Sequence, residues 1–70
     1  MPDGKSVWTK DSDGHMEHYK IYEDGDVYKV DHNLILPDTT TKVGSGSSLQ
    51  NGIELAKSDS GGKVDSIDDL

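Results

Sequence analysis

The sequence predicts an α+β fold, in which a small antiparallel sheet packs against one short helix. The expected sheet is a three-stranded meander with one or two further short strands. Two Asp-Gly pairs separate segments of alternating apolar and polar residues, which is typical of β-hairpins. A β-branched run follows Pro37, and a Gly- and Ser-rich break then precedes a stretch whose apolar residues have helical spacing.

The first half of the chain predicts two hairpins, whose turns are Asp11-Ser12-Asp13-Gly14 and Glu23-Asp24-Gly25-Asp26. Two-residue loops at Asp13-Gly14 and Asp24-Gly25 pair Trp8 with Tyr19 and Ile21 with Tyr28. Because side chains alternate between the two faces of a sheet, this register predicts a core face and an opposite face. The core face carries Trp8, Tyr19, Ile21, Tyr28 and Val30. The opposite face, left to solvent or a second subunit, carries Val7, His18, Lys20, Tyr22, Val27, Lys29 and Asp31.

The segments after the meander predict two more extended stretches. Asn33 to Leu36 is expected to form a short strand that ends at Pro37, because proline suits a strand end. The run from Thr39 to Val43 is β-branched and therefore expected to be extended.

A helix of roughly ten residues is expected to follow the Gly- and Ser-rich break. Ser47 with Gln50 three positions later predicts a capping box, and Gly61-Gly62 predicts the helix end. One apolar stripe is formed by Leu49, Ile53 and Ala56, with Gly52 and Leu55 beside it.

The length of 70 residues predicts a single domain over residues 1–70, with its core between about 5 and 57. For residues 58–70 two outcomes stay open: a last short strand around Val64 and Ile67, or partial disorder. With no cysteine to form disulfides, a small domain commonly gains stability by oligomerising, so we expect a homodimer.

Fourteen acidic residues face seven lysines and no arginine, which gives a net charge of −7. This balance disfavours direct binding of nucleic acid or an anionic membrane and favours a basic partner. The sequence contains no apolar run of membrane-spanning length and no secretory pattern at its start, so we expect a cytoplasmic protein.

Carboxylates of the first half are the candidate partner-binding residues. Glu23 facing Asp26 in the predicted register would be a like-charge pair that costs stability, which suggests that the charge is kept for a partner. Solubility alone also explains an acidic surface, and both explanations stay open. The candidates are Asp11, Asp13, Glu17, Glu23, Asp24, Asp26, Asp31 and Asp38.

The sequence predicts no metal site. An EF-hand beginning at Asp11 would need an oxygen ligand, Gly and Glu where the chain has His15, Met16 and Tyr22. His15 and His18 are three apart on a strand and so point to opposite faces. In the predicted register His32 lies opposite Glu17, so surface histidines explain all three.

Catalysis and cofactor binding are not expected either. Gly44-Ser45-Gly46 lacks the remaining residues of a dinucleotide or P-loop fingerprint. No serine shows a recognisable arrangement with His and Asp, and a thin core can hardly enclose a water-excluding cleft. We therefore expect a non-enzyme without a cofactor.

In size, acidity, lack of cysteine and acidic turns, the chain resembles the DNA-mimic inhibitors of bacteriophages. These include proteins that block uracil-DNA glycosylase and the host-takeover inhibitor of the nucleoid protein HU. The resemblance implies a target in the host cytoplasm, no catalysis and self-association.

A second resemblance is to the small YegP-like proteins, which combine antiparallel strands with a helix. It rests on the turns at Asp11-Ser12-Asp13-Gly14 and Asp24-Gly25, and on Asn51-Gly52-Ile53-Glu54 leading into Lys57. This resemblance implies a structural or interaction module whose acidic surface only provides solubility.

Overall fold

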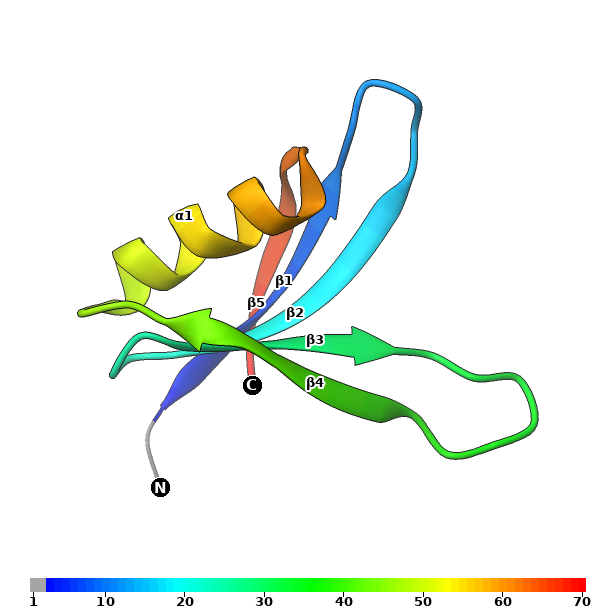
Figure 1. The fold of residues 1–70 in the computed structure, drawn as a ribbon, viewed down its shortest axis with the longest axis horizontal. Coiled ribbons are helices and arrows are strands. Elements are labelled where there is room, and N and C mark those ends of the chain that lie inside the picture. Colours follow the sequence, from blue (N-terminus) through cyan, green and yellow to red (C-terminus); the bar gives the residue numbers. More distant parts are fainter. Residues whose placement is uncertain (1–2) are drawn as a thin grey trace.

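The computed structural model describes residues 3–70 and contains five strands and one helix (Figure 1). In chain order the elements are β1 (Gly4–Lys10), β2 (Met16–Tyr22), β3 (Asp26–Asp31), β4 (Thr39–Ser45), α1 (Leu49–Ser60) and β5 (Lys63–Asp69).

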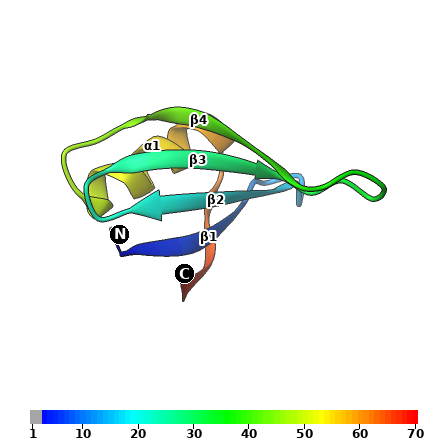
Figure 2. The same ribbon diagram turned by 90° about the horizontal axis from the view of Figure 1, so that it is seen from below.

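The strands form one sheet in the order β4-β3-β2-β1-β5, and every neighbouring pair is antiparallel. The helix lies across one face of this sheet and contacts β1, β2, β3 and β4 (Figures 1 and 2). The predicted α+β class is therefore confirmed, as is the extended Thr39–Val43 segment. Of the two outcomes left open for residues 58–70, the structure has the last strand, which contains Val64 and Ile67. Because β5 pairs with β1, Gly4 lies beside Leu70 and Lys5 lies opposite Asp69.

Both hairpin loops are one residue longer than the sequence predicts. Gly14 N donates to Asp11 O at 3.0 Å, and Gly25 N donates to Tyr22 O at 2.9 Å. Gly14 and Gly25 have φ angles of 84° and 97°. Each loop is thus a three-residue connection in which a tight turn is followed by a glycine in the left-handed conformation. Glycine adopts this conformation without the strain that a Cβ atom causes.

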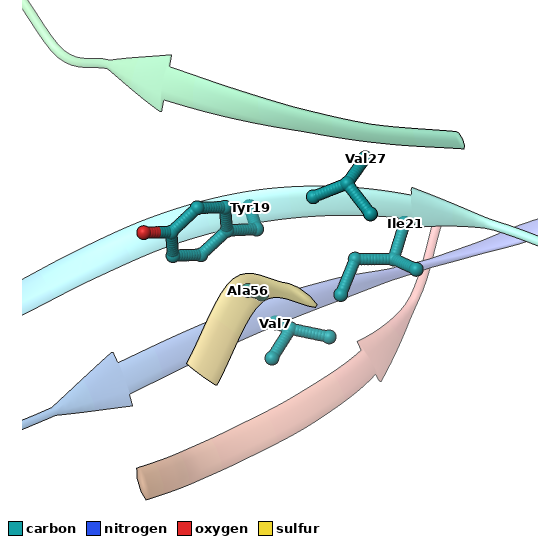
Figure 3. Close-up of a cluster of buried hydrophobic side chains, with 5 residues drawn as sticks. All are labelled: Val7, Tyr19, Ile21, Val27 and Ala56. Carbon is teal, nitrogen blue, oxygen red and sulfur yellow. The ribbon is translucent and has the colours of Figure 1, made fainter. Parts of the chain in front are cut away.

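This extra loop residue shifts both registers by one position and changes the core. Val7, not Trp8, lies opposite Tyr19, and Val27, not Tyr28, lies opposite Ile21. A one-residue shift moves a whole strand's side chains to the other face. The core under the helix is formed by Val7, Tyr19, Ile21, Val27 and Ala56 (Figure 3).

The predicted core face was therefore right for Tyr19 and Ile21 and wrong for Trp8 and Tyr28. Val30 is buried, but it pairs with His18 on the face that the helix leaves uncovered. We call this the outer face. Of the residues predicted opposite the core, His18, Lys20 and Tyr22 lie on the outer face, whereas Val7, Val27, Lys29 and Asp31 alternate onto the helix side.

The predicted strand over Asn33 to Leu36 is wrong. These residues form the loop between β3 and β4, where Asn33 Nδ2 donates to Pro37 O at 3.0 Å. Leu34, Ile35 and Leu36 are exposed, so this apolar run has no neighbouring strand to pair with.

The helix begins one residue later than predicted, because Ser48 and not Ser47 is its N-cap. Ser48 has extended backbone angles and its Oγ accepts from Asn51 N at 3.2 Å. The predicted end is confirmed by Gly61, which is left-handed and donates its N–H to Lys57 O. Gly52 and Ala56 are buried, and the rest of the predicted stripe, Leu49, Ile53 and Leu55, packs around the core.

Within residues 3–70, the helix is neither long nor apolar enough to cross a membrane.

Candidate partner-binding surface

The eight candidate carboxylates lie at the two ends of the sheet. Since all strands are antiparallel, the β1–β2 turn and the β3–β4 loop share one end, and the β2–β3 turn lies at the other. The first end carries Asp11, Asp13, Glu17, Asp31 and Asp38, and the second carries Glu23, Asp24 and Asp26.

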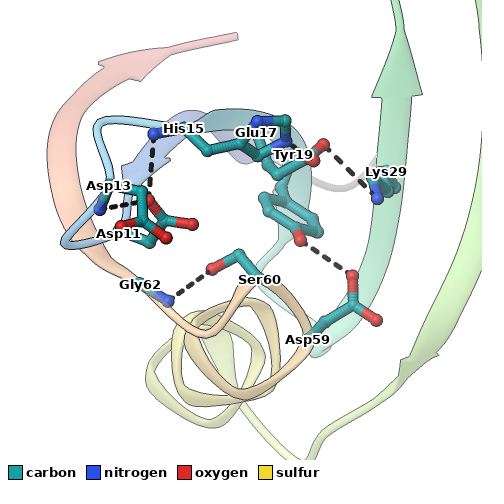
Figure 4. A network of polar contacts seen from close by, with 9 residues as sticks. All are labelled: Asp11, Asp13, His15, Glu17, Tyr19, Lys29, Asp59, Ser60 and Gly62. Atoms are coloured by element: carbon teal, nitrogen blue, oxygen red, sulfur yellow. Dashed lines mark hydrogen bonds and ion pairs between the residues drawn. The ribbon is translucent and has the colours of Figure 1, made fainter.

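Two carboxylates of the first end stabilise the β1–β2 hairpin. Asp11 Oδ1 accepts from the backbone N–H groups of Asp13 and His15, both at 2.9 Å (Figure 4). The Glu17 carboxylate lies 2.7 Å from His15 Nε2 and 3.3 Å from Lys29 Nζ. These acidic residues thus have local structural partners, as turn carboxylates commonly do.

A further contact at this end joins the helix to the sheet. The Tyr19 hydroxyl donates to Asp59 Oδ2 at 2.8 Å (Figure 4). Burial raises the pKa of Tyr19, and the neighbouring Asp59 carboxylate raises it further. The hydroxyl therefore stays protonated and keeps the end of the helix in place.

At the second end, the predicted repulsive pair of Glu23 and Asp26 does not occur. The β2–β3 register continues with Tyr22 opposite Asp26, and Glu23 lies in the turn itself. Asp26 Oδ1 accepts from Ser45 Oγ at 2.7 Å. Asp24 Oδ1 accepts from Asp26 N at 3.1 Å. The Glu23–Asp26 pair is absent because the three-residue loop places Glu23 in the turn, outside the hydrogen-bonded ladder of β2 and β3.

The tertiary structure does assemble a new group of carboxylates at this end. Glu23 N donates to Asp3 O at 2.9 Å, and Leu70 N donates to Gly4 O at 3.2 Å. These contacts bring both chain ends beside the β2–β3 turn around a hollow of about 640 Å³. We call it the terminal hollow; its lining is Asp3, Gly4, Lys5, Lys20, Tyr22, Glu23, Asp69 and Leu70.

Two lysines, Lys5 and Lys20, lie among these acids, and within residues 3–70 Lys5 is the one that is ion-paired. Its ammonium group is ion-paired with Asp69, which is the main reason that the pKa of Lys5 is raised, and the charges of Glu23 and Asp3 raise this pKa further. The same pair lowers the pKa of Asp69. Asp3 and Asp69 were not among the sequence-based candidates. The available signal was the pair of apolar residues Val64 and Ile67, which allowed a last strand but did not indicate that this strand pairs with β1.

A second polar group, which sequence reasoning missed, lies on the outer face. Its side chains form a continuous hydrogen-bonded series: Ser6 Oγ to His18 Nε2 at 2.6 Å, His18 Nδ1 to His32 Nε2 at 2.8 Å, and His32 Nδ1 to Asp38 Oδ2 at 2.8 Å. The Trp8 indole is nearly parallel to both imidazoles, with ring centroids 4.3 Å from His18 and 5.6 Å from His32. We call these residues the histidine network.

The Asp38 carboxylate determines which groups donate and which accept hydrogen bonds in the histidine network. An ionised Asp38 only accepts, so His32 Nδ1 donates to it and His32 Nε2 is free to accept from His18 Nδ1. The Ser6 hydroxyl then donates to His18 Nε2. Burial lowers the pKa of His18, as do His32 and Lys20, against the opposing effect of Asp38.

This network corrects the prediction that His32 pairs with Glu17. His15 and His32 are exposed, as predicted for surface histidines, whereas His18 is partly buried. His18 Nδ1 and His32 Nε2 lie 2.8 Å apart, so the two imidazoles are hydrogen-bonded to each other. Among residues 3–70 there is no group of three or more His, Cys, Asp or Glu side chains placed to hold a metal ion.

No family model, curated protein or solved structure matches this chain.

Proposed function

We propose that this chain is a non-catalytic acidic binding protein that occupies the DNA-binding surface of a basic protein by imitating the charge of DNA. The observation that carries the proposal is the terminal hollow, where Asp3, Glu23 and Asp69 come from three separate segments and outnumber the two lysines of the lining, Lys5 and Lys20. The nucleoid protein HU is the first target to test.

Charge supports this proposal through association kinetics and specificity. A net charge of −7 on 70 residues attracts a basic groove and repels nucleic acid. We therefore propose a basic nucleic-acid-binding protein as partner, without direct nucleic acid or membrane binding. A cytoplasmic location and a homodimer belong to the same proposal.

The alternative is a structural or interaction module of the YegP-like kind, whose acids only provide solubility. One observation favours it: Asp11 and Asp24 accept hydrogen bonds from turn backbone, and Glu17 is ion-paired. Such carboxylates have a use within the fold and need no partner to explain them.

Two double variants with the same change of charge separate these proposals. Asp3→Asn with Glu23→Gln neutralises two acids of the terminal hollow. Glu54→Gln with Asp65→Asn neutralises two acids on α1 and β5, away from the hollow. Both raise the net charge by two, so their comparison isolates position from total charge.

The assay measures the binding of each variant to purified HU, and the release of labelled duplex DNA from HU, at low and moderate salt. We expect the wild type to displace DNA, with weaker binding at higher salt. The hollow variant should bind about tenfold more weakly than the control variant. Equal binding by both variants would mean that the hollow is not the contact surface, and a wild type that never displaces DNA would favour the alternative.

A further inference from the structure

Among residues 3–70, the loop between β3 and β4 carries the most exposed large apolar residues. Leu34, Ile35 and Leu36 have relative exposures of 104%, 95% and 69%. Both views of the ribbon show this loop projecting beyond the body of the sheet (Figures 1 and 2). We call these three residues the apolar tip.

An apolar tip is costly for this particular protein. The chain has only fourteen Leu, Ile and Val residues, and its core is small. Three of these fourteen residues are exposed to solvent in the apolar tip and contribute nothing to the core. A contiguous run of exposed apolar residues is typical of a binding surface.

The base of the loop is ordered by hydrogen bonds. Asn33 Nδ2 donates to Pro37 O at 3.0 Å, and Asn33 N donates to Asp38 Oδ1 at 3.3 Å. The other oxygen of Asp38 accepts from His32, whose ring is parallel to Trp8. The tip is therefore held out from a rigid base, so less conformational entropy is lost when it binds.

Charges beside the tip indicate what it fits. Asp31 and Asp38 flank the loop, and within residues 3–70 the Asp31 carboxylate has no side-chain hydrogen bond or ion pair. The segment from residue 30 to residue 41 contains no lysine or arginine. An apolar surface with a basic rim would bury the tip and neutralise its flanking carboxylates.

We infer that the apolar tip packs against an apolar surface with a basic rim on the protein that this chain binds. The inference deepens the proposed function and rests on it, since it adds a buried anchor to a charge-driven contact. In protein interfaces, buried apolar anchors carry most of the affinity and the charged rim steers association.

The test uses two helical peptides of equal positive charge, one amphipathic and made of Leu and Lys, the other with each Leu replaced by Gln. The variant is Leu34→Ser, Ile35→Ser and Leu36→Ser in one chain. Its control is Ile67→Ser, which changes a half-exposed apolar residue on β5. Thermal unfolding checks that each variant remains folded, and exposed positions are expected to leave the melting temperature unchanged.

We expect the triple variant to bind the Leu/Lys peptide at least about tenfold more weakly than the wild type, with unchanged binding of the Lys/Gln peptide. The Ile67→Ser variant should bind both as the wild type does. Equal binding of the Leu/Lys peptide by wild type and triple variant would overturn the inference, as would a wild type that binds neither peptide.

Two other occupants are separate outcomes that also overturn it. One is binding to phosphatidylcholine vesicles that the triple variant loses, and the other is a dimer, seen by sedimentation, that the triple variant abolishes.

Binding to HU distinguishes failure of this inference from failure of the proposed function. If the wild type binds HU and the triple variant binds it equally, only the tip is excluded, whereas no binding to HU excludes the charge-mimic function itself.

Discussion

Replacing Gly52 with alanine tests how closely α1 approaches the sheet. Gly52 is buried in the helix above the centre of the core. A Cβ atom at this position would lie 2.5 Å from Ile21 Cγ2 and 3.2 Å from Val27 Cγ2. Both methyl groups sit on branched carbons of fully buried side chains, so neither can swing aside.

Two effects of opposite sign determine the stability of the Gly52→Ala variant. Alanine is favoured over glycine within a helix by about 1 kcal/mol. Overpacking a filled core costs about 1–3 kcal/mol. Because the 2.5 Å approach is far inside van der Waals contact and the neighbours are stiff, we expect the upper part of that range. The net loss is then about 1–2 kcal/mol, against a total stability of about 4–10 kcal/mol for a domain of this size.

Urea unfolding, followed by circular dichroism and by the fluorescence of Trp8, measures this loss. The control is Ser58→Ala, at an exposed position of the same helix, where alanine should stabilise by a few tenths of a kcal/mol. If Gly52→Ala is as stable as the wild type or more stable, the argument that glycine is required for close helix–sheet packing is wrong.

Three further predictions follow from the register and the pKa shifts. Val27→Ala should lower the free energy of unfolding by about 2 kcal/mol and Tyr28→Ala by less, and the reverse order in urea titrations would support two-residue loops. The free energy of unfolding should fall as the pH drops below 6.5, because the lowered pKa of His18 means that the unfolded chain binds more protons than the folded one. Urea unfolding midpoints measured between pH 7.5 and 5 should show this decrease, and it should be smaller in the His18→Gln variant. The raised pKa of Tyr19 predicts that one tyrosine ionises later than in the unfolded chain during alkaline absorbance titration, and Tyr19→Phe should remove that component if the assignment holds.

Local sequence signals determined the elements of this fold. The two Asp-Gly turns predicted both hairpins, the threonine run predicted β4, and Gly61 predicted the helix end. Each of these signals acts within a few residues: a glycine enters a left-handed conformation, and a β-branched side chain prefers an extended backbone. Such preferences are readable without knowing what lies across the sheet.

The register and the surfaces were decided by tertiary structure. An Asp-Gly pair fits a two-residue loop and also the end of a three-residue loop, and the choice between them depends on whether Val7 or Trp8 packs under the helix. The same register places Val27, not Tyr28, opposite Ile21 under the helix, and these are the two side chains that a Cβ at position 52 would approach too closely. Local preferences cannot distinguish these arrangements, because a shift of one residue leaves every local conformation nearly the same and changes which face is buried.

The candidate sites depend on contacts that are even more distant in the chain. The terminal hollow exists because β5 pairs with β1 and brings Asp69 to Lys5. The histidine network exists because the outer face places His18 beside His32. By itself, the sequence determined the number of charges and most of the elements that carry them. Which charges and rings meet was decided by packing between strands far apart in the chain, since only closure of the sheet brings those side chains within a few ångströms.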